Sequence, residues 1–265
     1  MRVALVLIGL VVGLSVVMTF AWAVVVASGR SGWVDAIWSY AIGLAGVAAA
    51  LVPLGAGAPT ARQVAVAILA AIWSLRLGLH IMQRTLAGGD DPRYAKLREE
   101  WGDRYRSQLF IFLQIQAAVA FLLALSILIA AHNPAPSWRI GDALGALLLV
   151  AAIVGEGIAD RQLRGFRDDP ANRGRVCDVG LWGVSRHPNY FFQWLGWLAY
   201  AVIAIEPLGG YGWGWLALSG PLIMYGLLVY VSGIPPLEAH MLRSRGDAFR
   251  VYQRRVNAFW PGPAR

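Results

Sequence analysis

Residues 3–27 read VALVLIGLVVGLSVVMTFAWAVVVA, with no charged side chain among them. A helix that crosses the hydrocarbon core of a bilayer needs about 20 consecutive apolar residues, and this run supplies them. The run is also longer than the apolar core of a typical cleaved signal peptide, so we expect a retained transmembrane helix. Gly9 and Gly13 have GxxxG spacing, which favours a helix-packing contact.

Composition extends this prediction to the whole chain, because 58% of the 265 residues are hydrophobic and only 14% are charged. A soluble domain of this length does not have such a composition. We predict an all-α, polytopic integral membrane protein with about seven transmembrane helices, basic loops and a C-terminal amphipathic helix. The expected spans are 4–27, 36–54, 63–83, 109–132, 141–160, 189–205 and 213–233, within one domain, 1–265. The lone Cys177 excludes an internal disulfide.

The distribution of arginine predicts the orientation, because positively charged loops are retained in the cytoplasm. Three arginine-rich regions, 84–106, 161–186 and 243–265, fall on one side of the membrane if the N-terminus is outside. The opposite side then keeps only Arg2, Arg62 and Arg139. We therefore expect the C-terminus and the basic loops in the cytoplasm.

The net charge of +8 is explained mostly by this topology. All but one of the 23 basic residues are Arg, however, and either a GC-rich genome or bidentate phosphate binding would produce that bias. We expect no nucleic-acid partner, because no basic groove with interleaved aromatic residues is visible. The sequence contains no GxGxxG or GxxxxGK[ST] motif either, so any nucleotide must be held in another way.

The segment Arg186-His187-Pro188-Asn189-Tyr190 leads directly into an apolar stretch and follows the arginine-rich region 164–175. Proline suits the first position of a helix, and the unpaired N–H groups of a helix start attract anions. Just upstream, 180–183 (Gly-Leu-Trp-Gly) predicts a tight turn with a flat ring that can stack on a base. We interpret the region as a site for a phosphate-bearing cofactor; side chains that merely reach the membrane interface are the alternative.

Two stripes of polar residues are predicted on helix faces. Glu156, Asp160, Arg164 and Arg167 follow one another at spacings of 4, 4 and 3, and Trp73, Arg76, Leu77, His80 and Arg84 repeat this pattern. An intramembrane carboxylate such as Glu156 is costly and indicates function. Asp35 can neutralise Arg76 or Arg84, either as a structural ion pair or in a pocket that polarises a substrate carbonyl.

The C-terminal tail is predicted to cover the basic loops. Pro235 and Pro236 end the last apolar stretch, and 237–256 reads as one amphipathic helix that carries Glu238 and Tyr252. A tail that only anchors to lipid is the alternative.

At the level of motifs the chain resembles the bacterial DUF1295 group, which is related to the C-terminal domain of steroid 5-alpha-reductases. The run Gly165–Trp197 carries most of the resemblance, through Asn172-Arg173-Gly174, Cys177-Asp178, Gly180-Leu181-Trp182 and Arg186-His187-Pro188-Asn189-Tyr190. Asp35-x-x-Trp38, Trp73-x-x-Arg76-Leu77, Asp91-x-Arg93-Tyr94 and Glu238 extend it. The shorter RHPxY signature is also similar to isoprenylcysteine and phospholipid methyltransferases, which use S-adenosylmethionine.

The resemblance implies an NADPH-dependent enzyme that reduces the conjugated double bond of an enone lipid, such as a 3-oxo-Δ4-steroid. In that reaction a hydride reaches the β-carbon while a proton donor polarises the carbonyl. The steroid enzymes pair a glutamate with a tyrosine at the ketone, and the first three helices show no such pair. We expect Asp35, Arg76 and His80 to substitute for it, within a substrate half at 1–108.

The half at 109–265 is expected to hold NADPH, with no metal. The cofactor-binding residues carried over from the resemblance and the polar stripes are Arg84, Glu156, Asp160, Arg164, Arg167, Asn172, Arg175, Asp178, Leu181, Trp182, Arg186, His187, Asn189, Tyr190, Glu238 and Tyr252. We expect a monomer in the bacterial inner membrane, with membrane lipid and a hydrophobic small molecule as partners. A methyltransferase, or a non-enzymatic scaffold or lipid-binding protein, are the alternatives.

Overall fold

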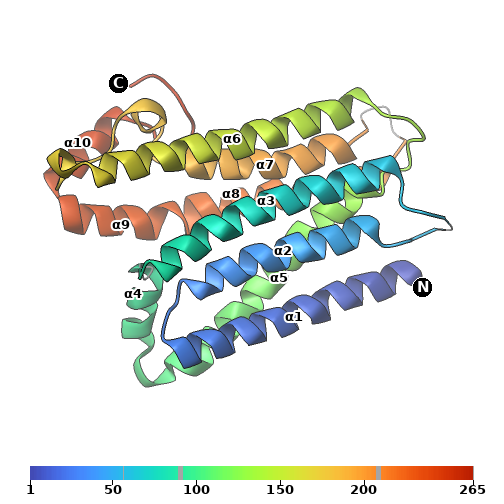
Figure 1. Cartoon of the computed structure of the whole chain (residues 1–265), viewed down its shortest axis with the longest axis horizontal. Coiled ribbons are helices and arrows are strands. Elements are labelled where there is room, and N and C mark those ends of the chain that lie inside the picture. Colours follow the sequence, from blue (N-terminus) through green and yellow to red (C-terminus); the bar gives the residue numbers. More distant parts are fainter. Residues whose placement is uncertain (56, 89–91, 207–209, 265) are drawn as a thin grey trace. The chain divides into compact units, whose positions relative to one another are not determined.

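The computed structural model describes residues 1–55, 57–88, 92–206 and 210–264, and this part of the chain forms helices and no strands (Figure 1). The predicted all-α class is confirmed. Helical segments that are long and apolar enough to cross a membrane are α1 (Arg2–Ser28), α2 (Trp33–Leu51), α3 (Ala61–Leu86), Arg93–Ala131, α6 (Ile140–Asp168) and Gly212–Arg245. The chain is therefore a multi-pass membrane protein.

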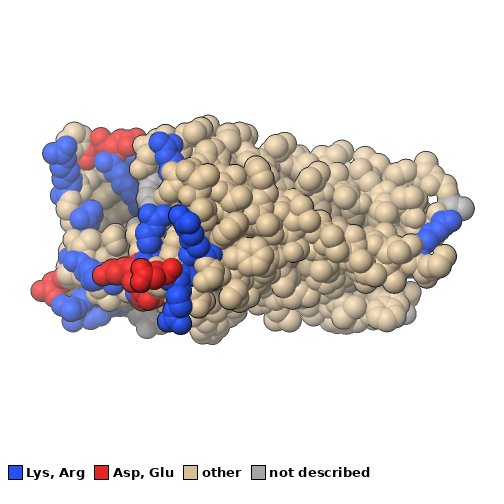
Figure 2. All heavy atoms as spheres, turned by 90° about the horizontal axis from the view of Figure 1, so that it is seen from below, with Lys and Arg blue, Asp and Glu red and all other residues tan. Residues whose placement is uncertain are grey.

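The span predicted at 189–205 is α7 (Pro188–Ala204), which has 17 residues. That length lies at the lower limit of about 17–25 residues for a transmembrane helix, so the count of seven spans stays a prediction. On the face drawn in Figure 2, the charged side chains gather in groups, and a broad surface without charged side chains lies between them. This pattern is typical of helices whose middle parts lie in hydrocarbon.

The helices form two compact units. The first comprises 1–145 and 200–220, and the second comprises 146–199 and 221–265. This division differs from the functional halves 1–108 and 109–265, which concern ligands and remain a prediction.

In the first unit, α2 packs against α1, α3 and α5 (Tyr105–Ala131). Close packing depends on a small residue: a Cβ added to Gly43 would lie 2.0 Å from the hydroxyl oxygen of Ser74 on α3. That hydroxyl donates a hydrogen bond to the carbonyl of Ser39 on α2, 2.9 Å away. Gly9 and Gly13, by contrast, have nothing within 4 Å of such a Cβ. In the described part of the chain no helix packs closely against Gly9 or Gly13, so the helix-packing contact predicted there is wrong.

Short helices join the longer ones of the first unit. α4 (Pro92–Trp101) and η1 (Gly102–Arg104) lead into α5, and η4 (Gly212–Leu218) packs against α5. The hydroxyl of Ser126 on α5 donates to the carbonyl of Ala217, 2.8 Å away.

In the second unit, α6 and α7 approach closely, because a Cβ at Gly155 would lie 2.4 Å from the ring of Phe192. The unit also contains η2 (Pro170–Asn172), η3 (Gly180–Gly183), α8 (Ser219–Gly226), the π-helical η5 (Leu227–Val231), α9 (Ile234–Arg245) and α10 (Asp247–Arg255). α7 starts at Pro188 as predicted, and the amide of His187 donates to the Ser185 hydroxyl oxygen, 3.2 Å away.

The tail differs from the prediction of one helix over 237–256. Gly246, with a φ of 54°, separates α9 from α10. Only glycine adopts a positive φ at little cost, and such a residue ends a helix. α10 is the strongly amphipathic part: Phe249 and Tyr252 are buried together with Val256, while Arg254 and Arg255 are exposed.

Candidate functional site

A carboxylate–tyrosine pair lies in the first unit. Asp35, in the first turn of α2, accepts hydrogen bonds from the guanidinium of Arg93 and from the hydroxyl of Tyr94, which is 2.9 Å away. The side-chain amide of Gln116 on α5 donates to the same hydroxyl oxygen at 3.4 Å. Tyr94 is 3% exposed. These four residues, named here the Asp35 cluster, form a polar group inside a largely apolar bundle.

Tyr94 is the residue that sequence reasoning missed. It lies on the short α4 and not on one of the first three spans, where a tyrosine was sought. The motif Asp91-x-Arg93-Tyr94 carried the signal; Asp91 itself lies outside the described residues. A tyrosine hydroxyl has one hydrogen, which it can donate either to the carboxylate or, when turned away from it, to a carbonyl oxygen; the nearby Arg93 compensates the negative charge of Asp35.

The other two predicted catalytic residues, Arg76 and His80, share one face of α3 with Arg84, which was predicted to bind the cofactor. Arg76 and His80 are half-buried and Arg84 is exposed near the end of the helix. All three make polar, ring or electrostatic interactions.

The polar stripe predicted on the next long helix is present on α6. Glu156 is buried, Asp160 is half-buried, and Arg164 and Arg167 are exposed, so the stripe runs from the interior to the helix end. The following loop adds the exposed Arg173 and Arg175, and Arg175 donates to the side-chain oxygen of Asn172 at 3.3 Å. The exposed guanidinium groups give this end of α6 a positive surface.

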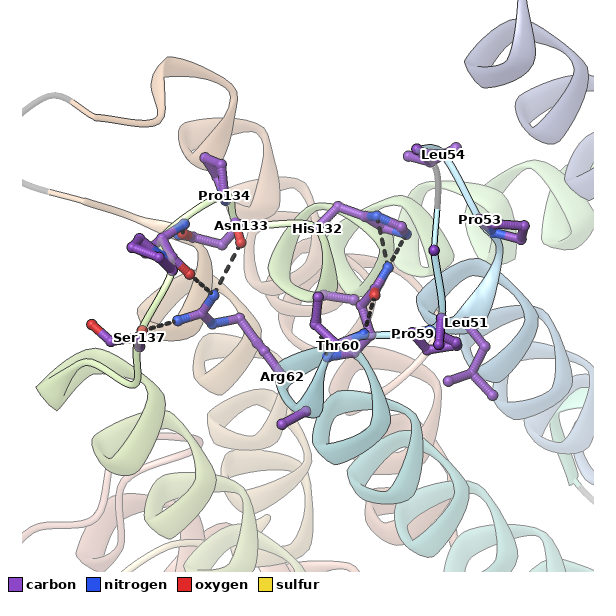
Figure 3. A pocket seen from close by; sticks show the side chains of 18 of the residues that line it. Leu51, Pro53, Leu54, Pro59, Thr60, Arg62, His132, Asn133, Pro134 and Ser137 are labelled. Carbon is purple, nitrogen blue, oxygen red and sulfur yellow. Dashed lines mark hydrogen bonds between the residues drawn. The ribbon is translucent and has the colours of Figure 1, made fainter.

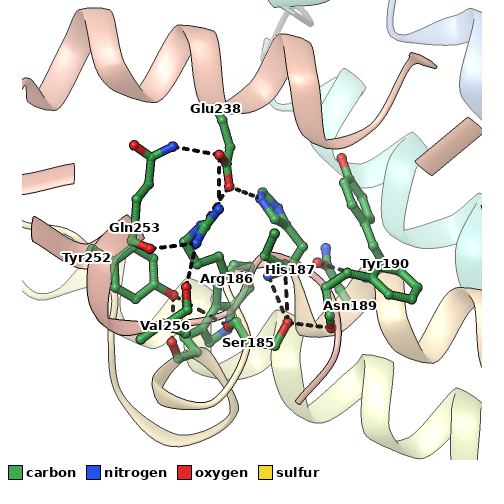
Figure 4. Close-up of polar contacts among 12 residues, drawn as sticks. Ser185, Arg186, His187, Asn189, Tyr190, Glu238, Tyr252, Gln253 and Val256 are labelled. Carbon is green, nitrogen blue, oxygen red and sulfur yellow. Dashed lines mark hydrogen bonds and ion pairs between the residues drawn. The ribbon is translucent and has the colours of Figure 1, made fainter. Parts of the chain in front are cut away.

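Glu238 joins three side chains into a largely buried polar group, which we name the Glu238 cluster: Arg186, His187, Glu238 and Gln253 (Figure 4). One carboxylate oxygen of Glu238 accepts from Arg186 Nε at 2.7 Å and from His187 Nε2 at 3.0 Å. The other accepts from Arg186 Nη2 at 3.2 Å and from Gln253 Nε2 at 2.7 Å.

Arg186 makes its hydrogen bonds to other parts of the protein. Besides its two bonds to Glu238, its Nη1 donates to the carbonyls of Gln253, at 3.0 Å, and Val256. Its backbone amide donates to the carbonyl of Asn257, 2.8 Å away. Arg186 therefore clamps the tail onto the segment before α7, which leaves it little capacity to bind a phosphate.

His187 is held in one tautomer. An ionised carboxylate only accepts, so Nε2 carries the hydrogen and Nδ1 keeps a lone pair. Nδ1 has no hydrogen-bond partner in the described part of the chain, and the side chain is 4% exposed. The ring stacks on Tyr190, with centroids 5.4 Å apart. Burial lowers the pKa of His187, although the bond to Glu238 opposes the shift. The site thus offers one buried acceptor.

The predicted turn at 180–183 is confirmed, but the ring of Trp182 points inward. Trp182 is buried, and its indole N–H donates to the carbonyl of Ala159, 2.9 Å away. The hydroxyl of Tyr252 donates to the carbonyl of Trp182 at 2.6 Å, and burial raises the pKa of that hydroxyl. A buried ring of this kind holds the turn in place and cannot stack on a base at the surface.

The remaining predicted cofactor residues also bond locally. The amide of Leu181 donates to the side-chain oxygen of Gln162 at 2.9 Å, and Asp178 pairs with Arg255 on α10. The amide of Tyr190, in the first turn of α7, donates to the side-chain oxygen of Asn189 at 3.1 Å. This donor of the predicted anion site is therefore occupied.

A cavity of about 530 Å³ opens between the stretches 51–55, 57–63 and 131–138 of the first unit, and we name it the Arg62 pocket (Figure 3). Arg62, at the start of α3, is 7% exposed and donates through Nε and Nη2 to the two carboxylate oxygens of Asp142, at 3.0 and 2.9 Å. The same guanidinium donates to the carbonyls of Asn133, Ala135 and Ser137.

The sequence explains this geometry. Proline alternates with other residues in the segment Asn133-Pro134-Ala135-Pro136-Ser137. A residue that precedes a proline is held in an extended conformation. In an extended segment alternate residues face the same way, so three carbonyls turn toward one guanidinium.

A family model described as "Protein of unknown function (DUF1295)" matches residues 21–256. No curated protein and no solved structure matches the chain. The matched range contains the Asp35 cluster, the Glu238 cluster and the lining of the Arg62 pocket.

Proposed function

The chain belongs to the DUF1295 family, and we propose that it is a membrane enzyme that reduces the conjugated double bond of an enone lipid with NADPH. The observation that carries this proposal is the hydrogen bond between Tyr94 and Asp35. The sequence resemblance to steroid 5-alpha-reductases implies a carboxylate and a tyrosine at the substrate ketone, and the Asp35 cluster supplies both.

Each residue of the Asp35 cluster has a role in this mechanism. The Tyr94 hydroxyl would turn its one hydrogen from Asp35 to the ketone oxygen and so stabilise the negative charge that grows there when the β-carbon is reduced. Before substrate binds, Asp35 holds that hydroxyl in place, and Arg93 compensates the carboxylate. Burial of Tyr94 strengthens the hydrogen bond, because water is excluded from the cluster. Arg76 and His80 are candidates for closing the polar wall around the ketone.

The cofactor assignment fits some of the predicted residues and not others. Bound NADPH would supply the hydride. The exposed guanidinium groups of Arg164, Arg167, Arg173 and Arg175 have the chemistry to hold its phosphates. Nδ1 of His187 offers an acceptor for an N–H or O–H group. Arg186 and Trp182 would instead support the fold around that site.

The cellular setting belongs to the same proposal. The resemblance to a bacterial group favours a protein of the bacterial inner membrane, and the arginine distribution favours an N-terminus outside and a C-terminus in the cytoplasm. The cofactor-binding loops would then face the cytoplasmic NADPH pool, and a monomer would take its hydrophobic substrate from the lipid.

A second candidate function is a methyltransferase that uses S-adenosylmethionine. The observation that favours it is the closed arrangement of the Glu238 cluster, in which Arg186 already has an anionic partner. A cofactor without phosphates needs no open guanidinium at this position.

Ligand-dependent stability of the purified protein in detergent distinguishes the two functions. We expect NADPH to raise the melting temperature more than NADH does, by the mass action of a ligand that binds only the folded state. Stabilisation by S-adenosylmethionine, without stabilisation by NADPH, would reject the reductase in favour of the methyltransferase.

Turnover of an enone lipid then tests the Asp35 cluster. Tyr94→Phe should keep NADPH-dependent stabilisation and lower kcat by roughly 10²–10³, the cost of one lost oxyanion donor. The matched control is Tyr105→Phe, because the Tyr105 hydroxyl has no hydrogen-bond partner in the described chain. Equal kcat values for the two variants would remove Tyr94 from the reaction.

A further inference from the structure

The Asp35 cluster contains one buried polar atom that the fold does not use. Tyr94 donates its single hydrogen to Asp35, 2.9 Å away, so its oxygen accepts from the side-chain amide of Gln116 at 3.4 Å. The NH₂ group of Gln116 must therefore face Tyr94, and the amide oxygen, Oε1, is the atom left over. Oε1 is buried and has no hydrogen-bond partner in the part of the chain that the structure describes.

The surroundings hold Gln116 in place and are largely aromatic. The indole N–H of Trp38 on α2 donates to the backbone carbonyl of Gln116, 3.1 Å away. The ring of Tyr94 meets the ring of Phe112 edge-on, with centroids 6.2 Å apart. A buried amide oxygen without a partner destabilises the fold, because it has given up its hydrogen bonds to water. A ligand that brings a donor would account for such an atom.

Gln114, two residues earlier on α5, shows the same side chain in a structural role. Its Oε1 accepts from the hydroxyl of Ser15 on α1 at 2.6 Å, and its Nε2 donates to the hydroxyl of Thr19 at 3.2 Å. Gln114 and Gln116 are both half-buried. Gln114 thus uses both ends of its amide to join α1 to α5, whereas Gln116 keeps one end unused beside the Tyr94 hydroxyl.

We propose that Gln116 selects the substrate: its Oε1 accepts a hydrogen bond from a hydroxyl group that the enone carries on the saturated carbon next to its ketone. This inference rests on the proposed function, in which Tyr94 turns its hydrogen to the ketone oxygen. The oxygen and nitrogen of one amide group are about 2.3 Å apart, so Oε1 lies within about 6 Å of the Tyr94 oxygen. A ketone with a neighbouring hydroxyl presents an acceptor and a donor at this scale. An enone without that hydroxyl would leave Oε1 unsatisfied.

Thermal unfolding of the full-length protein in detergent, without ligand, tests the unused acceptor. Met is unbranched like Gln but has no amide, so Gln116→Met removes the unsatisfied oxygen together with one long hydrogen bond. Its melting temperature should equal or exceed that of the wild type. Gln114→Met is the matched control: it loses two hydrogen bonds and should melt roughly 2–6 °C lower. If both variants melt equally low, Oε1 of Gln116 has a structural partner and the proposal is wrong.

Substrate preference tests the role of Gln116 directly. The probes are two 3-oxo-Δ4-steroids, one with and one without a hydroxyl on carbon 2, assayed with NADPH. The wild-type kcat/KM should be about tenfold higher for the hydroxylated steroid. This preference should disappear in Gln116→Met and persist in Gln114→Met. Equal reduction of both steroids by the wild type would refute the role of Gln116 and leave the reductase standing. Reduction of neither steroid would overturn the inference and, with it, the proposed reductase.

Discussion

Glu238→Gln should destabilise the protein strongly, although it changes one atom. Each carboxylate oxygen of Glu238 accepts one hydrogen bond from Arg186, so whichever oxygen becomes NH₂ faces a guanidinium donor, and the guanidinium loses its anionic partner. The side chains of Arg186 and Glu238 are 11% and 13% exposed, so the pair is largely buried. Breaking a buried pair costs roughly 3–5 kcal/mol, which for a chain of this size lowers Tm by roughly 6–20 °C.

Thermal unfolding in detergent, followed by tryptophan fluorescence, measures this cost, and Asp247→Asn is the matched control. Asp247 pairs with Arg250 in the same tail, but these side chains are 90% and 64% exposed. Exposed pairs contribute about 0–1 kcal/mol, so the control should melt within a few degrees of wild type. If Glu238→Gln and Asp247→Asn melt together, the Glu238 cluster does not hold the tail and our reasoning about Arg186 fails.

Two further predictions concern packing and pH. Gly43→Ala would place a methyl group 2.0 Å from the Ser74 oxygen and should lower the free energy of unfolding by about 1–3 kcal/mol. Gly13→Ala is the control and should leave that free energy unchanged, because the surroundings of Gly13 are open. Equal melting temperatures for the two variants would contradict the close contact between α2 and α3. Because the pKa of His187 is lowered in the folded protein, the unfolded chain binds a proton first as the pH falls, so stability is full above about pH 6.5 and declines below it. His187→Asn should lose less stability than wild type between pH 7.5 and 5, and an equal loss would exclude this histidine.

Much of the fold could be predicted from the length of the apolar runs and from the prolines that begin or end helices. The long run 3–27 became α1, Pro188 starts α7, and the break before α9 lies beside Pro235 and Pro236. These features are local, because hydrocarbon length and proline geometry act within a few residues. Gly246 was overlooked because an amphipathic pattern can continue across a sharp turn while the backbone does not.

The candidate site was harder to predict, because it depends on contacts between distant segments. The partners Asp35 and Tyr94 are 59 positions apart, and Arg186 and Glu238 are 52 apart. Spacing along one helix predicted the polar stripe on α6, but it could not show that Arg186 donates its hydrogen bonds to other parts of the protein. An arginine that binds a ligand and an arginine that binds a tail look identical in sequence.

Arg62 has a consequence for how this chain can vary. Its guanidinium fills five hydrogen-bonding roles at once, two toward Asp142 and three toward the carbonyls of the proline-interrupted segment. A lysine has only three donors on a single nitrogen, so it could not make all five of these hydrogen bonds. We therefore expect that lysine does not replace arginine at position 62, and that relatives with this arginine also keep the alternating prolines.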